Sequence, residues 1–242
     1  MNNSVYEEKF KLRINDYDNR DHIYLGAIMD LFQDVAGSHA DLLHIGYDDL
    51  IKNDLIWMIL RNKVEIYNSK PKSDYVIVKT WPHIPGRVDM DRDYVIYSED
   101  GELIAKGCSK WVICSYTTRK LIRAKDFNYN IDKFCEDVNF DEPFDKVIFD
   151  DDYGDFKTGE VKTTFLDVDH NGHINNTKYL NYIFICVEEI QNKEIKRFQI
   201  DYLHELTKNS MVTIKYYQIG NAIFVKGISC NQDCFVAKIE LE

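Results

Sequence analysis

The sequence predicts an α+β protein in which one structural unit occurs twice, each unit being an antiparallel sheet wrapped around one long helix. Two observations predict this class. First, sliding the chain against itself by 151 residues aligns two Asp, one His and one Ile. The aligned pairs are Asp16 with Asp167, Asp18 with Asp169, His22 with His173, and Ile23 with Ile174. Second, both copies are flanked by the same order of elements, a strand, a helix and then several strands.

The first unit begins with a strand-like run at 6–14 and continues into an amphipathic helix. Apolar residues recur in that helix at steps of three or four, and Gly46 suits its end. They are Leu25, Met29, Phe32, Ala36, Ala40 and Leu43. Four strand-like runs follow, at 57–67, 75–81, 93–98 and 103–115. Glu99-Asp100-Gly101 predicts a hairpin turn between the last two.

The second unit repeats this order. A Val- and Thr-rich run at 160–166 predicts a strand, and Asn175 is the expected N-cap of the helix that follows. The apolar face of that helix consists of Leu180, Ile183, Val187 and Ile190. Further strand-like runs lie at 197–203, 212–217, 223–229 and 235–241. The acidic segment between the units, interrupted by Pro143, predicts a surface linker, which gives domains at 1–125 and 156–242 joined by 126–155.

Composition narrows the functional classes. With 242 residues and 45% hydrophobic content, the chain can bury a sizeable core. No apolar run approaches the length of a membrane span, and the start of the chain lacks a secretory signal, so we expect a cytoplasmic protein. Its net charge of −11 argues against nucleic acid as the main partner. The six cysteines form no paired framework and are expected to be reduced: Cys108, Cys114, Cys135, Cys186, Cys230 and Cys234.

The stretch 167–176 carries the most chemistry. It places carboxylate, amide and imidazole groups in one turn that enters a helix, with Glu205 further along the chain, and these groups can position and deprotonate a water molecule. The same stretch partly matches a calcium-binding EF-hand loop. That interpretation fails because Lys178 occupies the position of the bidentate Glu and because a strand, not a helix, precedes the loop. We therefore expect no metal at this turn.

The stretch 169–179 resembles the Asp-x-Asn-x-His-(Val/Ile)-Asn-Asn-x-Lys-Tyr signature of the acyl-acyl carrier protein (acyl-ACP) thioesterases of plants and bacteria. The segment 202–206 is similar to the family's Tyr-Arg-Arg-Glu-Cys segment. The resemblance covers essentially the whole chain and implies two tandem hotdog domains, with the acyl pocket in the first and the catalytic residues in the second. The family's functional positions carry over as Asp169, Asn171, His173 and Glu205.

One position departs from that pattern. Many family members have a Cys after the catalytic Glu, but this chain has Leu206, which cannot attack a thioester. We expect Glu205, partly desolvated beside Leu206, to act as general base on water, with direct carboxylate attack as the alternative. His173 would share that water or protonate the leaving sulfur.

The remaining site residues have supporting roles in this hypothesis. Asn171 would hold the water or the carbonyl oxygen, and Asp169 would orient His173. Backbone N–H groups after Asn175 would complete an oxyanion site. The chemistry requires neither a metal nor a cofactor. Each residue also has a structural interpretation, as turn former, cap or solvated charge. In the first copy Arg20 replaces Asn171, which indicates a structural relic.

The substrate chain and its carrier define the expected contacts. The resemblance places the acyl slot beside the first helix, where Phe32, Trp57 and Met58 are candidate wall residues. Acyl carrier protein is acidic, so an acidic enzyme should bind it through a local basic patch. The densest basic run is Lys106, Lys110, Arg119, Lys120, Arg123 and Lys125, followed by Lys193, Lys196 and Arg197.

Two alternatives stay open at this level. A hotdog acyl-CoA thioesterase would use the same chemistry on a different carrier. A non-catalytic acyl-binding module would keep the fold without hydrolysis. The chain could act as a monomer, because two fused units can supply the pairing that single hotdog subunits obtain by dimerising, or as a homodimer.

Overall fold

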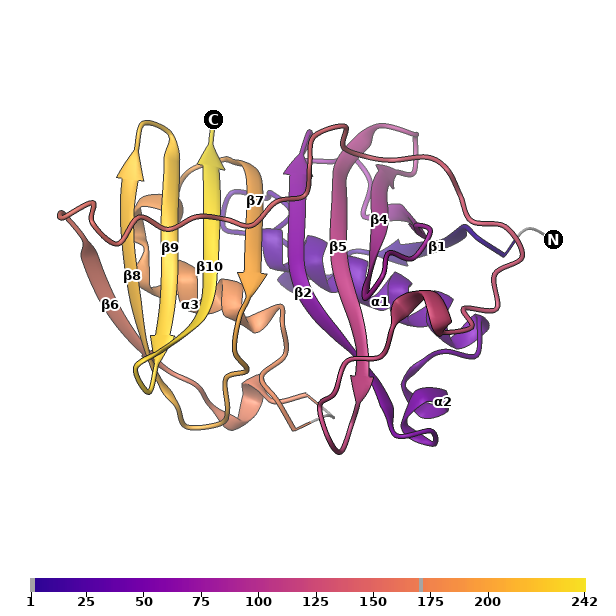
Figure 1. The fold of residues 1–242 in the computed structure, drawn as a ribbon. Coiled ribbons are helices and arrows are strands. Elements are labelled where there is room, and N and C mark those ends of the chain that lie inside the picture. Colours follow the sequence, from indigo (N-terminus) through magenta and orange to yellow (C-terminus); the bar gives the residue numbers. More distant parts are fainter. Residues whose placement is uncertain (1–2, 170–171) are drawn as a thin grey trace. The chain divides into compact units, whose positions relative to one another are not determined.

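The computed structural model describes residues 3–169 and 172–242, and the chain divides into two compact units, Met1–Pro143 and Phe144–Glu242 (Figure 1). Each unit is one antiparallel sheet with one principal helix, which confirms the predicted α+β class. Within the described residues, no helix is both long and apolar enough to cross a membrane.

The first unit follows the predicted order. Strand β1 (Tyr6–Lys11) leads into helix α1 (Leu25–Leu42), the short helix α2 (Tyr47–Ile51), and four long strands. These strands are β2 (Leu55–Ile66), β3 (Tyr75–Pro82), β4 (Asp89–Ser98) and β5 (Leu103–Ser115). They lie side by side in the order β1-β3-β4-β5-β2. The apolar stripe of α1, which includes Ile28 and Val35, is buried.

The second unit has the same topology. Strand β6 (Lys157–Lys162) leads into helix α3 (Lys178–Cys186) and four strands. These are β7 (Ile195–Tyr202), β8 (Met211–Ile219), β9 (Ala222–Ser229) and β10 (Gln232–Leu241). Their order, β6-β8-β9-β10-β7, matches that of the first unit strand for strand. The internal repeat inferred from the sequence is therefore confirmed at the level of topology.

Close packing between helix and sheet depends on a small residue in β5. A Cβ atom at Gly107 would lie 2.3 Å from Cε2 of Phe32 on α1, so only glycine lets the ring rest on the strand. The ring of Phe32 also stacks on Tyr94, with centroids 4.6 Å apart. This contact fixes the distance between α1 and the sheet.

Several predicted boundaries are wrong. The strand-like runs at 6–14 and 160–166 both end in a 3-10 turn, at Ile14–Asp16 and Phe165–Asp167. The second helix ends at Cys186, and a separate 3-10 turn, Glu188–Ile190, contains the last apolar residue of the predicted face. Its N-cap is Thr177 and not Asn175. Short helix α2 was not predicted.

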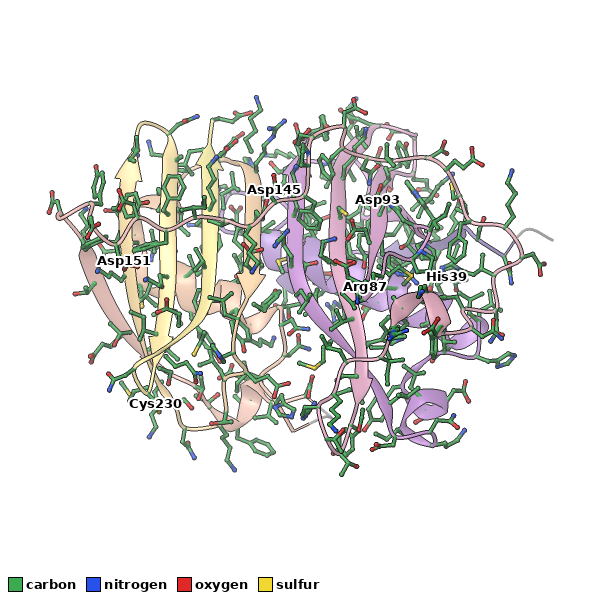
Figure 2. The ribbon with its side chains drawn as sticks, viewed as in Figure 1. His39, Arg87, Asp93, Asp145, Asp151 and Cys230 are labelled. Carbon is green, nitrogen blue, oxygen red and sulfur yellow. The ribbon has the colours of Figure 1, made fainter. Side chains whose placement is uncertain are left out.

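The segment between the two repeats packs against both units, each part on its own side of the division. In the first unit, the side chain of Asn139 donates to the backbone oxygens of Tyr94 and Gly107, at 2.7 and 2.9 Å. In the second unit, Lys226 Nζ lies 2.6 Å from both carboxylate oxygens of Asp151. Asp151 is labelled in Figure 2. Partly buried hydrogen bonds and an ion pair thus hold this irregular segment to the sheets.

Candidate active site

The predicted catalytic turn is built by backbone hydrogen bonds. The carboxylate of Asp167 accepts the backbone N–H of Thr164 at 2.6 Å, which closes the 3-10 turn. The N–H of Asp169 donates to the carbonyl of His173 at 2.8 Å, and the N–H of Asn175 donates to the carbonyl of Asp167, also at 2.8 Å. Gly172 has a φ of +80°, which glycine adopts without strain. The sequence therefore folds into a narrow loop with His173 near its base.

The first unit contains the same loop. The N–H of Asp18 donates to the carbonyl of His22 at 2.8 Å, and the N–H of Tyr24 donates to the carbonyl of Asp16 at 2.8 Å. Asp21 takes the place of Gly172, with a φ of +60°. The four aligned residues thus belong to loops that share the same two backbone hydrogen bonds in both units.

The second loop brings together an imidazole and a carboxylate. Nδ1 of His173 lies 3.2 Å from Oε2 of Glu205, which follows strand β7 in a loop of its own. The backbone N–H of Ile174 donates to the carbonyl of Leu206 at 3.4 Å, so the two loops are joined next to this pair. The predicted meeting of His173 with Glu205 is therefore present in the structure.

The environment of the pair is partly open to solvent. The side chain of Glu205 keeps 42% of its exposure and that of His173 keeps 28%. Leu206 itself is buried, at 1% exposure, but it does not bury its neighbour. Glu205 is therefore only partly removed from solvent, and far less so than Leu206.

The other predicted site residues are placed as follows. Asp169 accepts the backbone N–H of His173 through Oδ1 at 3.4 Å, so its carboxylate supports the loop that carries the imidazole. Asn171 lies outside the described residues. Two of the backbone N–H groups that follow Asn175 already have acceptors. The N–H of Thr177 donates to the side-chain oxygen of Asn175 at 3.0 Å, and the N–H of Lys178 donates to its backbone oxygen at 2.9 Å. These two N–H groups are occupied within the turn and are unsuited to an oxyanion.

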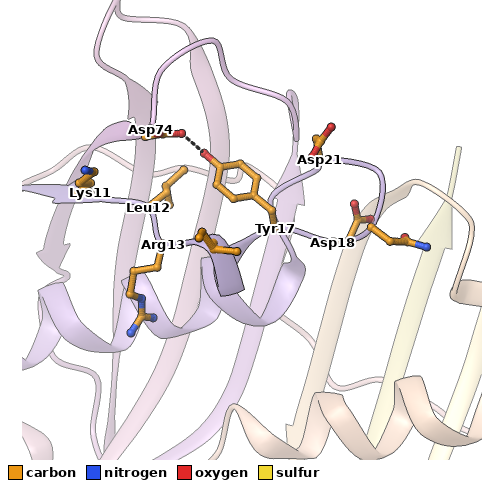
Figure 3. A pocket seen from close by; sticks show the side chains of 9 residues that line it. Lys11, Leu12, Arg13, Tyr17, Asp18, Asp21 and Asp74 are labelled. Atoms are coloured by element: carbon orange, nitrogen blue, oxygen red, sulfur yellow. Dashed lines mark hydrogen bonds between the residues drawn. The ribbon is translucent and has the colours of Figure 1, made fainter.

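The loop of the first unit has different chemistry. Nδ1 of His22 lies 3.1 Å from the hydroxyl of Ser69, where the second unit offers a carboxylate. Arg20 donates to the carboxylate of Asp18 from Nε and Nη2, at 3.1 and 2.8 Å. An open pocket of about 850 Å³ adjoins this loop, with Tyr17 hydrogen-bonded to Asp74 at 3.0 Å in its wall (Figure 3). In this copy a serine hydroxyl therefore lies beside the imidazole, and an arginine binds the carboxylate that aligns with Asp169.

The candidate wall residues fall on two faces of the first sheet. Trp57 contacts Trp111, whose Nε1 donates to Ser109 at 2.6 Å. Ser109 in turn bonds Tyr94, the ring on which Phe32 stacks, so Trp57 and Phe32 share the helix-facing side. Met58 is the next residue of the same strand and therefore points to the opposite face, where its sulfur lies 3.1 Å from Cys114.

The predicted basic run divides into two parts. Lys110 on β5 lies 2.6 Å from Asp91 and 3.3 Å from Asp89, so carboxylates neutralise its charge. The loop after β5 instead exposes four cations, Arg119, Lys120, Arg123 and Lys125. Asp54 anchors this loop by accepting the hydroxyl of Ser115 at 2.7 Å and the backbone N–H of Thr117 at 2.9 Å.

Comparison with known proteins agrees with this fold. The acyl-ACP thioesterase N-terminal domain matches residues 3–130, and the acyl-ACP thioesterase C-terminal domain matches residues 151–237. An acyl-ACP thioesterase from Bacteroides thetaiotaomicron has a similar structure, with a TM-score of 0.86 and 20% identity over 99% of this chain and 98% of that one. The 12:0-ACP thioesterase from Umbellularia californica gives a TM-score of 0.81, at 22% identity over 98% and 97% of the two chains.

Curated relatives agree at the level of sequence. Oleoyl-acyl carrier protein thioesterase 2, chloroplastic, from Arabidopsis thaliana is 28% identical over 226 residues, which are 86% of this chain and 61% of the relative. Palmitoyl-acyl carrier protein thioesterase, chloroplastic, from Gossypium hirsutum is 25% identical over 243 residues, 93% of this chain and 59% of the relative. The chain thus spans about three fifths of the length of these relatives.

Fold and site together define a protein of two tandem hotdog units with an imidazole–carboxylate pair in the second. The chain belongs to the acyl-ACP thioesterase family.

Proposed function

We propose that this chain hydrolyses the thioester of a fatty acyl-ACP and releases a free fatty acid, the step that ends chain growth in fatty acid synthesis. The observation that carries the proposal is the 3.2 Å approach of His173 Nδ1 to Glu205 Oε2 in the unit whose loop matches the family signature. An imidazole next to a carboxylate provides an acid and a base within reach of one water molecule.

The proposed reaction runs through water. Glu205 takes a proton from a water molecule while the oxygen of that water attacks the thioester carbonyl carbon. This attack forms a tetrahedral intermediate. The carbon–sulfur bond then breaks, and His173 gives a proton to the departing thiolate. Asn171 would hold the carbonyl oxygen through its amide, and Asp169 supports the loop of His173. No nucleophilic thiol is needed, in agreement with Leu206 at the position after Glu205.

We propose that the acyl slot lies in the first unit, beside α1. Phe32 and Trp57 lie on that side and are proposed as wall residues, whereas Met58 faces away from them. A slot lined by aromatic and aliphatic side chains removes the acyl chain from water, which favours binding by about 0.8 kcal/mol for each buried methylene group.

We further propose that the carrier docks on the cationic loop after β5. Its four exposed cations stand out on a chain of net charge −11, and hydrogen bonds to Asp54 anchor the start of the loop at Ser115 and Thr117. An acidic carrier would be attracted to such a site and repelled by most of the remaining surface.

The six cysteines are all free, which fits the reducing cytoplasm as the compartment.

The function is tested by incubating the purified chain with matched acyl-ACP and acyl-CoA substrates and identifying released fatty acids by mass spectrometry. The proposal expects free acids and a clear preference for acyl-ACP. A preference for acyl-CoA would assign the chain to the alternative carrier, and binding of acyl-ACP without any hydrolysis would make it an acyl-binding module.

The docking loop is tested by charge reversal. Arg119→Glu with Lys120→Glu should raise KM for acyl-ACP about tenfold at low salt and leave hydrolysis of acyl-pantetheine unchanged, because only the carrier reads the charge. Lys193→Glu with Lys196→Glu is the matched control, since it changes the net charge by the same amount at exposed positions of the second unit. Equal effects of the two pairs would show that net charge alone, and not this loop, attracts the carrier.

A further inference from the structure

Two tyrosines connect the segments that carry the imidazole and the carboxylate. The hydroxyl oxygen of Tyr179, on helix α3, accepts the backbone N–H of Leu206 at 3.0 Å. The hydroxyl of Tyr202, at the end of strand β7, donates to the backbone carbonyl of Asn176 at 3.1 Å. The first bond joins the start of α3 to the loop after β7, and the second joins the end of β7 to the turn before α3.

The two bonds are reciprocal with respect to the site. Tyr179 belongs to the helix that follows His173, and it holds the residue next to Glu205. Tyr202 belongs to the strand that precedes Glu205, and it holds the turn that follows His173. The pair, which we name the tyrosine clasp, therefore fixes each catalytic segment from the element that carries the other one.

The surroundings make the clasp rigid. The rings of Tyr179 and Tyr202 pack edge to face, with centroids 5.2 Å apart and planes at 90°. Tyr179 is only 3% exposed, and its ring also contacts Phe235 at 5.4 Å. Burial raises the pKa of Tyr179, so its hydroxyl stays neutral at physiological pH. Leu206 is buried as well, so no water replaces its hydrogen bond without opening the structure.

The repeat provides an internal comparison. The offset that aligns the two loops puts Ile28 of the first unit at the position of Tyr179. Ile28 is fully buried in α1 and has no polar group to hold a neighbouring loop. The unit with Ser69 beside its imidazole thus lacks this half of the clasp, whereas the unit with the acid–base pair has it.

We infer that Tyr179 and Tyr202 are positioning residues for the hydrolysis, acting through Glu205 and His173 without touching the substrate. The inference rests on the proposed thioesterase function. Both Glu205 and His173 keep substantial exposure, so packing alone does not hold their relative position. The clasp supplies that restraint, and a reacting geometry lost by about 1 Å lowers a rate by up to 10²-fold.

Removal of single hydroxyl groups tests the clasp. Tyr179→Phe and Tyr202→Phe should each lower kcat for acyl-ACP about tenfold and leave KM within about twofold, because positioning acts in the transition state and not in substrate binding. Tyr216→Phe is the matched control. Tyr216 is 6% exposed, lies on β8 of the same unit, and donates its hydroxyl to Glu189, which follows α3, at 3.0 Å. This variant should keep both constants.

A second measurement reports on the hydrogen bond between Tyr179 and Leu206. Amide hydrogen exchange of the peptide containing Leu206 should speed up in Tyr179→Phe and stay unchanged in Tyr216→Phe. The inference is overturned if both clasp variants keep the kcat of the control, or if they raise KM at unchanged kcat. A wild-type chain that hydrolyses nothing would instead overturn the proposed function, and faster exchange at Leu206 would still show that the clasp holds the loop.

Discussion

A buried histidine in helix α1 makes a quantitative prediction about pH and stability. His39 is completely buried. Its Nε2 lies 3.0 Å from the carbonyl of Asn3, and its Nδ1 lies 3.1 Å from Nη1 of Arg92. A carbonyl only accepts and a guanidinium only donates, so Nε2 carries the proton and the ring is neutral. Burial, reinforced by the positive charge of Arg92, lowers the pKa of His39 from 6.5 to about 4.

The sign and size of the effect follow from these two values. The unfolded imidazole titrates near 6.5 and the folded one near 4, so between these pH values the unfolded state binds more protons. The contribution of a neutral His39 to stability is complete above pH 6.5 and is lost as the pH falls. The total loss is about 3 kcal/mol when the pH reaches the folded pKa.

Urea unfolding at pH 7.5 and pH 4.5 measures this loss. His39→Gln cannot titrate, and its amide has both a donor and an acceptor for the two neighbours. Between the two pH values the wild type should lose about 2.5 kcal/mol more unfolding free energy than this variant. Carboxylates titrate in both proteins, so they cancel in the difference. Identical pH dependence of the two proteins would refute the neutral, buried imidazole.

Three further substitutions test the copied loop and the helix packing. His22→Ala should leave kcat/KM for acyl-ACP unchanged within about twofold, because a serine hydroxyl lies beside its imidazole and Arg20 binds the neighbouring Asp18; a large loss would give the first loop a catalytic role. Gly172→Ala should lower the unfolding free energy by about 1 kcal/mol, since its φ of +80° is strained for alanine; an unchanged urea midpoint would exclude that strain. Gly107→Ala should cost about 1–3 kcal/mol in the same assay, because the new Cβ would overlap Phe32; a neutral result would mean that α1 moves away at no cost.

Much of the fold could be predicted because its elements have strong periodic patterns. Helix α1 and the long strands β2 and β5 cover most of the residues that the sequence predicts for them. The 3-10 turn at Phe165–Asp167 was missed because Phe165 and Leu166 continue the strand-like pattern of the preceding run, although they are 74% and 84% exposed. Their conformation depends on one carboxylate, that of Asp167, bonding back to Thr164, and apolar periodicity does not register such a bond.

The site was predictable in its residues and less so in its environment. The resemblance to the acyl-ACP thioesterases implied that His173 and Glu205 would meet, and the two side chains lie 3.2 Å apart. The exposure of Glu205 depends on how the loop after β7 lies over the sheet, which its neighbour Leu206 does not determine. The role inferred for Tyr179 was also hidden, because a tyrosine on the apolar face of a helix usually indicates core packing alone. The hydroxyl group of Tyr179 was the available indication, because a buried hydroxyl requires a hydrogen-bond partner.

The most direct test of the catalytic pair is single-turnover hydrolysis of acyl-ACP by Glu205→Gln, His173→Asn and the double variant, compared with Glu160→Gln, an exposed carboxylate on strand β6. If Glu205 and His173 work as a unit, each single variant should lose at least about 100-fold in rate, and the double variant should lose little more than either. Glu160→Gln should match the wild type. Full activity of either single variant would contradict the assignment of thioester hydrolysis to this pair.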